Sequence, residues 1–316
     1  MADQAIVPRY EALQAPAAAL RAASEALCAA PSATSLETAR TALADARRAW
    51  KAVEAMWVGP VMLRRAWTMI DWPINPDDID SLVGSTTPPT IDVDHIFSSV
   101  GSDQRGLRAV EYLLSADDVR FDAFPGRRCD YLVSVTEIIS AQCDLLLTDW
   151  TAGTDGGVPY RDTFVDSRNT SVDKVVNGVF NLLKEITTLE LGIALGFMGV
   201  PNLEAITEGA AALGVADLQA RVSGIRRVLV GDDRSKGLGP LLGGELTERL
   251  RAQLDTADEA IAAVDSPLRT AIATDTGSVR TMRAAIQAIE TTVATEVMSK
   301  LGVKVSFSNF DGDSGF

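Results

Sequence analysis

The sequence predicts an all-α protein made of two four-helix-bundle-like domains packed together. The 316 residues are rich in alanine and leucine and only 6% are aromatic, a composition that favours helices over sheets. Apolar residues recur at three- and four-residue spacing, and glycine and proline fall mostly between these stretches. The glycine-rich stretch 151–159 is the best boundary, so we expect one domain over 1–152 and a second over 153–316.

Each domain is expected to hold about four long amphipathic helices. In the first half, the apolar spacing predicts helices over 6–29, 35–56, 92–100 and 129–150. In the second half, it predicts helices over 172–195, 203–213, 217–229, 244–264 and 278–301. A capping box at 34–37 opens the second helix, and the segment 71–89 is expected to be a packed irregular loop. The tail 303–307 alternates like a strand but cannot form a sheet alone.

Charge and composition exclude several classes of protein. The formal net charge of −14 argues against nucleic acid as a partner, because phosphates would be repelled. No apolar run approaches the ~20 residues of a membrane span, so we expect a protein that does not cross the membrane. The single histidine, His95, excludes a zinc site built from several histidines. Cys129 and Cys143 lie too far apart on one predicted helix to pair, so we expect the cysteines to be buried small residues; a bridge from Cys28 to either is the alternative, which no pattern in the sequence supports.

A polar pair stands at the start of the helical pattern in 103–114. Arg108 and Glu111 are three residues apart, so they share one face of a helix that follows Gly106. Taken alone, a pair of this kind is typical of a solvated surface. Its position after a long irregular segment is where functional residues often occur.

Several short motifs, in order along nearly the whole chain, carry a family resemblance. They are Ile6-Val7-Pro8-Arg9-Tyr10, Arg47-Arg48-Ala49-Trp50, Gly59-Pro60-Val61, Trp72-Pro73, Gly106-Leu107-Arg108-Ala109-Val110-Glu111, Leu189-Glu190-Leu191-Gly192 and Phe307-Ser308-Asn309-Phe310-Asp311. Together they resemble the imelysin family, also classified as peptidase family M75. The resemblance implies two helical bundles, a link to iron acquisition, and a bacterial protein that is periplasmic or anchored at the outer membrane or cell surface, with its signal peptide removed.

The family signature is Gly-x-His-x-x-Glu, and this chain departs from it. Gly106 and Glu111 match, but Arg108 stands in the place of the histidine. A guanidinium stays protonated and offers no lone pair, so a metal site in the family's form is not expected. An arginine beside a glutamate suits a carboxylate or phosphate-like ligand. A structural pair without a ligand, or a rebuilt metal site, are the alternatives.

We expect the ligand site to lie in a cleft between the bundles. Its predicted residues are Gly106, Arg108, Glu111, Glu54, Trp57 and Trp72. If Glu54 faces inward, it needs a partner, for which Arg108 is the natural candidate; the alternative is a glutamate at a helix edge. Glu185 and Glu190 are further candidates from the second half. The candidate ligands for iron or another divalent ion are Glu111, His95 and Asp92.

These observations favour a non-enzymatic, exported binding protein tied to iron uptake, which binds a small ligand or metal ion and partners another envelope protein. One alternative is a metal-dependent peptidase, as the family's classification implies. It has little support, because the chain contains no GxSxG, no HExxH and no Cys/His pairing. A scaffold for envelope proteins is the other alternative. The stretch 309–313 resembles a calcium loop but lacks the later glutamate, so we expect it to cap the C-terminus.

Overall fold

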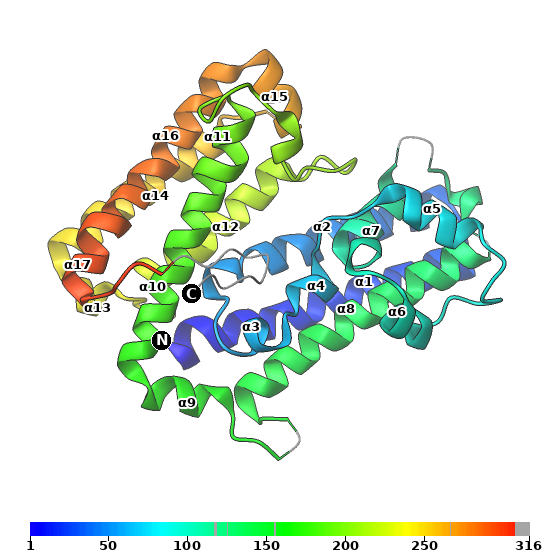
Figure 1. Cartoon of the computed structure of the whole chain (residues 1–316), viewed down its shortest axis with the longest axis horizontal. Coiled ribbons are helices and arrows are strands. Elements are labelled where there is room, and N and C mark those ends of the chain that lie inside the picture. Colours follow the sequence, from blue (N-terminus) through cyan, green and yellow to red (C-terminus); the bar gives the residue numbers. More distant parts are fainter. Residues whose placement is uncertain (117–118, 125, 155, 266, 307–316) are drawn as a thin grey trace.

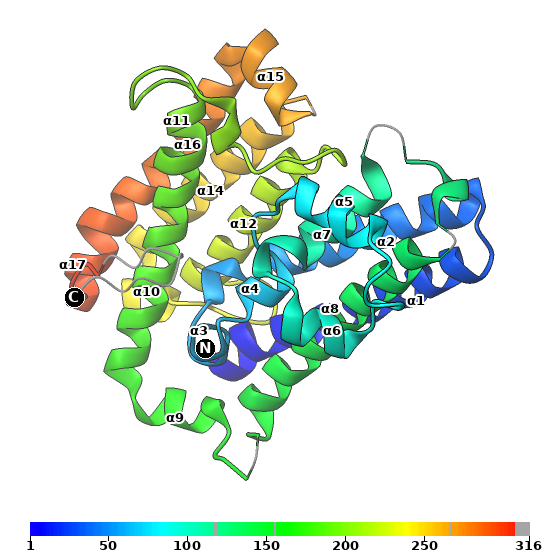
Figure 2. The same cartoon turned by 45° about the vertical axis from the view of Figure 1, so that its right-hand side comes forward.

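The fold is all-α, as predicted. The computed structural model describes residues 1–306 except 117–118, 125, 155 and 266. Within these residues, helices alternate with turns, and the extended pairing is limited to one antiparallel bridge between Asp71 and Gly106. Figures 1 and 2 show two groups of helices that cross at an angle and meet along α2 and α12.

The first group is built on three long helices. They are α1 (Val7–Ala29), α2 (Ala33–Lys51) and α8 (Arg127–Thr151). The shorter α7 (Leu107–Ser115) packs on α2 and α8 and takes the fourth position. A disulfide joins Cys28 to Cys129 and ties the end of α1 to the start of α8, which decides the pairing that the sequence left open. Cys143 is a buried free thiol.

Two local expectations in this group were wrong. The capping box that opens α2 is formed by Ser32 and Ser35, two residues before the predicted one, because Ser32 has the extended backbone that a cap requires. The segment 71–89 contains a helix, α5 (Pro76–Gly84), rather than an irregular loop alone. Asn75 caps α5, and Pro76 presets the backbone of its first turn. Four short helices complete this part: α3 (Pro60–Arg64), α4 (Trp67–Ile70), α5 and α6 (Val93–Ser99).

The second group contains four long helices. They are α10 (Arg168–Lys184), α12 (Gly214–Leu229), α14 (Gly244–Ala262) and α16 (Thr276–Thr292). α10 continues through a π turn (Glu185–Glu190) into α11 (Leu191–Ala194), and α16 continues through another π turn (Val293–Val297) into α17 (Met298–Leu301). The short helices are α9 (Tyr160–Asp166), α13 (Gly239–Leu242) and α15 (Leu268–Thr274). The proposed division at residues 152–153 falls between α8 and α9 and stays a prediction.

The helix expected over 203–213 was wrong. Only a single 3-10 turn, Leu203–Ala205, forms there. The rest of the segment is irregular because its polar groups serve other elements. Glu208 accepts hydrogen bonds from the backbone N–H groups of Gly214, Leu268 and Arg269, so it caps two helices at once.

The expected strand-like tail has no regular secondary structure over residues 303–306, and in the described chain it does not pair with a strand. Instead, the amide of Asn177 on α10 donates to the carbonyl of Lys304 at 3.0 Å and accepts from the N–H of Ser306 at 2.7 Å. A side-chain amide thereby replaces the neighbouring strand. The stretch 309–313 lies outside the described residues.

α8 is long and apolar enough, by length and composition, to cross a membrane, and its apolar character needs an explanation. Half of its most apolar stretch is buried inside the protein. α8 also packs against α1 and α7 and carries one half of the disulfide. Its apolar character is therefore explained by its place in the core of the first group.

Candidate functional site

A buried chain of charged side chains runs through the interface between α2 and α12. Arg47 and Lys51 are four residues apart on α2, and Asp217 and Arg221 are four apart on α12, so each pair points from one helix face. All four residues are buried. Charges this far from water require partners, because an isolated ion in the interior is costly.

Arg47 is fully enclosed and joins three segments. It forms ion pairs with Glu111 on α7 and with Asp217 on α12, the latter at 2.7 Å, and it donates to the carbonyl of Thr207 at 3.2 Å. Glu111 also accepts a hydrogen bond from the N–H of Ala211 at 3.0 Å. Burial lowers the pKa of Arg47, but the carboxylates of Asp217 and Glu111 outweigh it and hold this pKa above its usual value.

Lys51 forms the next link. Its ammonium lies 2.6 Å from Glu54 and 2.6 Å from Asp71. The guanidinium of Arg108 lies 3.1 Å from the other oxygen of Asp71. Burial alone would raise the pKa of Asp71, yet the cations Lys51, Arg108 and Arg47 hold this pKa well below its usual range. Asp71 is therefore a carboxylate at neutral pH.

Glu54 was expected either at a helix edge or paired with Arg108, and neither is the case. It is buried in a 3-10 turn (Glu54–Met56) after α2. Its carboxylate pairs with Lys51 at 2.6 Å and with Arg221 at 2.5 Å. The reason is the geometry of the interface, because α12 brings Arg221 to this turn while Arg108 is held by Asp71.

Arg221 gathers three carboxyl groups. Besides Glu54, it pairs with Glu190 at 2.8 Å and with Glu185 at 3.1 Å. Residues five apart on an α-helix point about 140° away from each other, and the π turn that spans Glu185–Glu190 reduces this divergence. The π turn therefore lets both glutamates reach the same guanidinium. Glu185 and Glu190 thus do lie where the two helix groups meet, as the sequence suggested.

A cavity of about 200 Å³ lies beside these charges. Three tryptophans, Trp57, Trp67 and Trp72, form its aromatic wall. Its charged wall is formed by Lys51, Glu54, Asp71, Arg108, Glu185 and Arg221. The structure therefore brings four of the six predicted site residues, Arg108, Glu54, Trp57 and Trp72, to one cavity between the helix groups.

The other two predicted residues, Gly106 and Glu111, do not line this cavity. Gly106 has a positive φ of 87° and forms the backbone bridge to Asp71. A Cβ at this position would lie 2.7 Å from the carbonyl oxygen of Ile70, so only glycine permits the bridge. Glu111 is held behind the wall by Arg47 and by the N–H of Ala211. Both residues support the site indirectly.

The candidate metal ligands do not come together. Asp92 caps α6 by accepting the N–H of His95 at 2.8 Å. Within the part of the chain that the structure describes, no group of three or more His, Cys, Asp or Glu side chains is arranged to hold a metal ion. Asp92, His95 and Glu111 therefore do not form one site there.

Five charged residues of the site were not predicted from the sequence: Arg47, Lys51, Asp71, Asp217 and Arg221. A signal was available for the first of these, because Arg47 lies four residues after Leu43 on the buried stripe of α2. A charge on an apolar stripe indicates a buried ion pair. The partner could not be read from the sequence, since Asp217 is 170 residues away.

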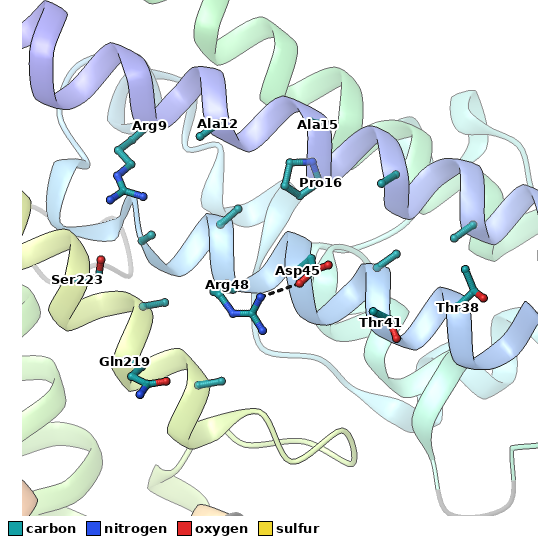
Figure 3. A pocket seen from close by; sticks show the side chains of 17 residues that line it. Arg9, Ala12, Ala15, Pro16, Thr38, Thr41, Asp45, Arg48, Gln219 and Ser223 are labelled. Carbon is teal, nitrogen blue, oxygen red and sulfur yellow. Dashed lines mark hydrogen bonds and ion pairs between the residues drawn. The ribbon is translucent and has the colours of Figure 1, made fainter. Parts of the chain in front are cut away.

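A larger cleft of about 940 Å³ lies among α1, α2 and α12 (Figure 3). Its walls consist mostly of alanines. Its polar side chains include Arg48 and Asp45 on α2, which pair with each other at 2.7 Å and are more than half exposed. Small apolar walls offer few specific contacts, so the charged cavity is the better candidate for a ligand.

The fold and the buried site define an all-α protein of two crossed helix groups with a charged cavity between them. The model of the imelysin (M75 peptidase) family matches residues 6–295, so the chain belongs to this family. No curated protein matches.

Two solved structures share the fold. An iron-regulated protein A precursor from Parabacteroides distasonis has a TM-score of 0.78 and 18% identity over 95% of this chain and 92% of that one. An imelysin-like protein from Psychrobacter arcticum has a TM-score of 0.80 and 16% identity over 97% and 94%. The disulfide is consistent with a location of this chain outside the cytoplasm. The Parabacteroides protein is described as a precursor, which is consistent with export of that protein.

Proposed function

We propose that this chain is a non-enzymatic, exported binding component of a bacterial iron-uptake system, and that its ligand occupies the cavity between the helix groups. The single observation that carries the proposal is the cavity itself. It combines three tryptophans with the partly exposed guanidinium of Arg108, at the position of the family's signature. Apolar walls with a few placed polar groups are typical of small-molecule sites.

The association with iron uptake rests on family membership and on the iron-regulated protein of similar fold. The disulfide between Cys28 and Cys129 supports export, because such bonds persist in oxidising compartments. The second partner, another envelope protein, follows from the role of a binding component.

Tryptophan fluorescence tests the ligand site, because three of the five tryptophans line the cavity. A panel of small carboxylates and phosphates is titrated into the untagged protein and into the variants Arg108→Gln and Arg249→Gln. Arg249 lies on the exposed face of α14, so its variant is the matched control. We expect a saturable change that Arg108→Gln removes and Arg249→Gln retains.

Metal analysis of the same untagged protein tests the metal-free character of the proposal. We expect no tightly bound stoichiometric metal and the same melting temperature with and without a chelator. One equivalent of metal that resists dialysis and raises the melting temperature would overturn the proposal in favour of a metal-dependent function.

Fractionation of the native host, followed by thiol labelling, tests export: the envelope fraction should hold the protein with one free thiol, Cys143.

A further inference from the structure

Counted with Glu190, which also pairs with Arg221, the charged wall of the cavity has one carboxyl more than it has cations. It carries three cations, Lys51, Arg108 and Arg221, and three carboxyls, Glu54, Asp71 and Glu185. The side chains of four of these groups are 5% exposed or less, so they serve one another. Arg108 and Glu185 differ, because 14% and 27% of their side chains are exposed. A ligand in the cavity can therefore reach one cation and one carboxyl.

Arg108 has an edge available for a ligand. Its Nη1 donates to the carbonyl of Thr207 at 2.8 Å. Its Nε lies 3.1 Å from Asp71 but has no hydrogen-bond partner of proper geometry among the described residues. A guanidinium with free N–H groups is suited to a carboxylate.

Glu185 is the surplus carboxyl of the Arg221 cluster. The charged groups that face it are Arg221 on α12, Glu190 on its own π turn, Glu54 on the 3-10 turn and Lys51 on α2. Glu54 and Glu190 already place two negative charges beside the single positive charge of Arg221. Burial, reinforced by the charges of Glu190 and Glu54, raises the pKa of Glu185 to about 7 despite Arg221. Near neutral pH, Glu185 can therefore be protonated, and its carboxyl O–H can donate a hydrogen bond to a ligand.

The aromatic wall indicates the shape of the ligand. The rings of Trp57 and Trp67 are stacked, with centroids 5.8 Å apart and an interplanar angle of 21°. The Nε1 of Trp67 is buried and has no hydrogen-bond partner within the described chain. A lining that contains three tryptophans favours a planar aromatic body, which packs well against indole rings.

We infer that the cavity binds a small planar monocarboxylate together with one proton, the carboxylate on Arg108 and the proton on Glu185. The inference rests on the proposed function and names the ligand class of the same site. With Glu185 neutral, the carboxylates of Glu54, Asp71 and Glu190 balance the three cations, so an anion on Arg108 adds a single negative charge to the site. With Glu185 ionised, the same anion would meet a second negative charge in a site of low dielectric, so binding should weaken as the pH rises through 7.

Calorimetry with benzoate tests this inference, because benzoate is planar and stays ionised at both of the pH values used. At about pH 8.5 we expect binding at least about tenfold weaker than at about pH 6, since one proton must be taken up. Titrations in two buffers of different ionisation enthalpy should show net proton uptake near pH 7. Benzamide, which has the same shape without the charge, should bind weakly at either pH.

Variants separate Glu185 from a general effect of pH. Glu185→Gln should bind benzoate with equal affinity at both pH values and without proton uptake. Glu185→Asp should retain the pH dependence, and Glu245→Gln on the surface of α14 should behave like the parent protein. Circular dichroism establishes that each variant is folded.

The outcomes distinguish this inference from the proposed function. Benzoate binding that is independent of pH in the parent protein, or a pH dependence that persists in Glu185→Gln, overturns the role of Glu185 and leaves the binding function intact. Absence of benzoate binding, with saturable binding of another probe of the fluorescence panel, overturns the ligand class alone. Absence of binding by every probe overturns both.

Discussion

Two clusters of charge lie in the same interface and differ in how completely they are paired. Arg47 is fully buried between Glu111 and Asp217, and backbone groups of Thr207 and Ala211 complete the first cluster. The second cluster, around Arg221, has three carboxyls for one guanidinium and a cavity beside it. We call the first cluster closed, because its charged groups are paired and enclosed. We call the second cluster open, because it has an excess of carboxyl groups and a cavity lies beside it.

The difference indicates a division of labour. A buried ion pair with all hydrogen bonds formed contributes specificity of packing, and it fixes how the two helix groups meet. A surplus carboxyl beside a cavity raises the energy of the empty state and is retained where a ligand or proton relieves it. The family's glutamate, Glu111, falls in the closed cluster. The position of the family's histidine, Arg108, faces the open one.

The largest expected effect is the loss of the closed cluster. Arg47→Met keeps the apolar stem but leaves Glu111 and Asp217 buried without a cation. We expect the free energy of unfolding to fall by about 3–5 kcal/mol, as for other buried pairs that lose one partner. Urea unfolding followed by circular dichroism measures it. The neighbouring Arg48→Met, on an exposed pair with Asp45, should change it by less than about 0.5 kcal/mol. Equal effects of the two substitutions would contradict the distinction between the clusters.

Removing the carboxyl of Glu185 from the open cluster should stabilise the protein at high pH, whereas removing Arg47 from the closed cluster should destabilise it. Glu185 has a pKa of about 7 in the folded protein and a reference value of 4.5, so the folded state binds the proton more tightly. Its unfavourable contribution is absent below about pH 4.5, grows between about pH 4.5 and 7, and is constant above. Glu185→Gln should therefore stabilise the protein by about 2–3 kcal/mol at about pH 8.5.

That gain should vanish near about pH 4.5, because both side chains are then neutral. Denaturant unfolding of the variant and the parent protein across this pH range provides the comparison. Glu204→Gln, at an exposed pair with Arg269, is the control and should show no such trend. If Glu185→Gln is destabilising at every pH, the glutamate belongs to a closed cluster as well.

A smaller loss of stability is expected from a substitution at Gly209, whose backbone packs against the carboxyl of Glu111. A Cβ at Gly209 would lie 2.6 Å from the carboxyl of Glu111, which cannot move because Arg47 and Ala211 hold it. Gly209→Ala should cost about 2 kcal/mol, the usual range for overpacking. Gly84→Ala, where a Cβ meets no atom within 4 Å, should be neutral within about 0.5 kcal/mol. Thermal unfolding of both variants decides whether Glu111 is held as rigidly as the contacts indicate.

The sequence predicted the helical class and most long helices, because their apolar spacing is strong and local. The predictions were wrong where residues with helical propensity form hydrogen bonds to groups that are distant in the sequence. The segment 203–213 has helical composition, yet its carbonyl at Thr207 and its carboxyl at Glu208 bind groups on other helices. Four site residues were predicted from motifs and aromatic content. The network that organises them was not, because every buried ion pair described above except Lys51–Glu54 joins residues from different parts of the chain.

The last prediction concerns Arg108, which should affect binding more than stability. Asp71 keeps Lys51 at 2.6 Å when Arg108 is removed, and Arg108 is partly exposed. Arg108→Gln should therefore lower the free energy of unfolding by only about 1 kcal/mol, the value of an ordinary hydrogen bond. The same variant should lose the tryptophan response to benzoate, and Arg108→Lys should restore part of it, since a point charge replaces a two-pronged donor. A loss of stability as large as that of Arg47→Met, with ligand response retained, would assign Arg108 to the closed cluster and leave the cavity without its anion-binding group.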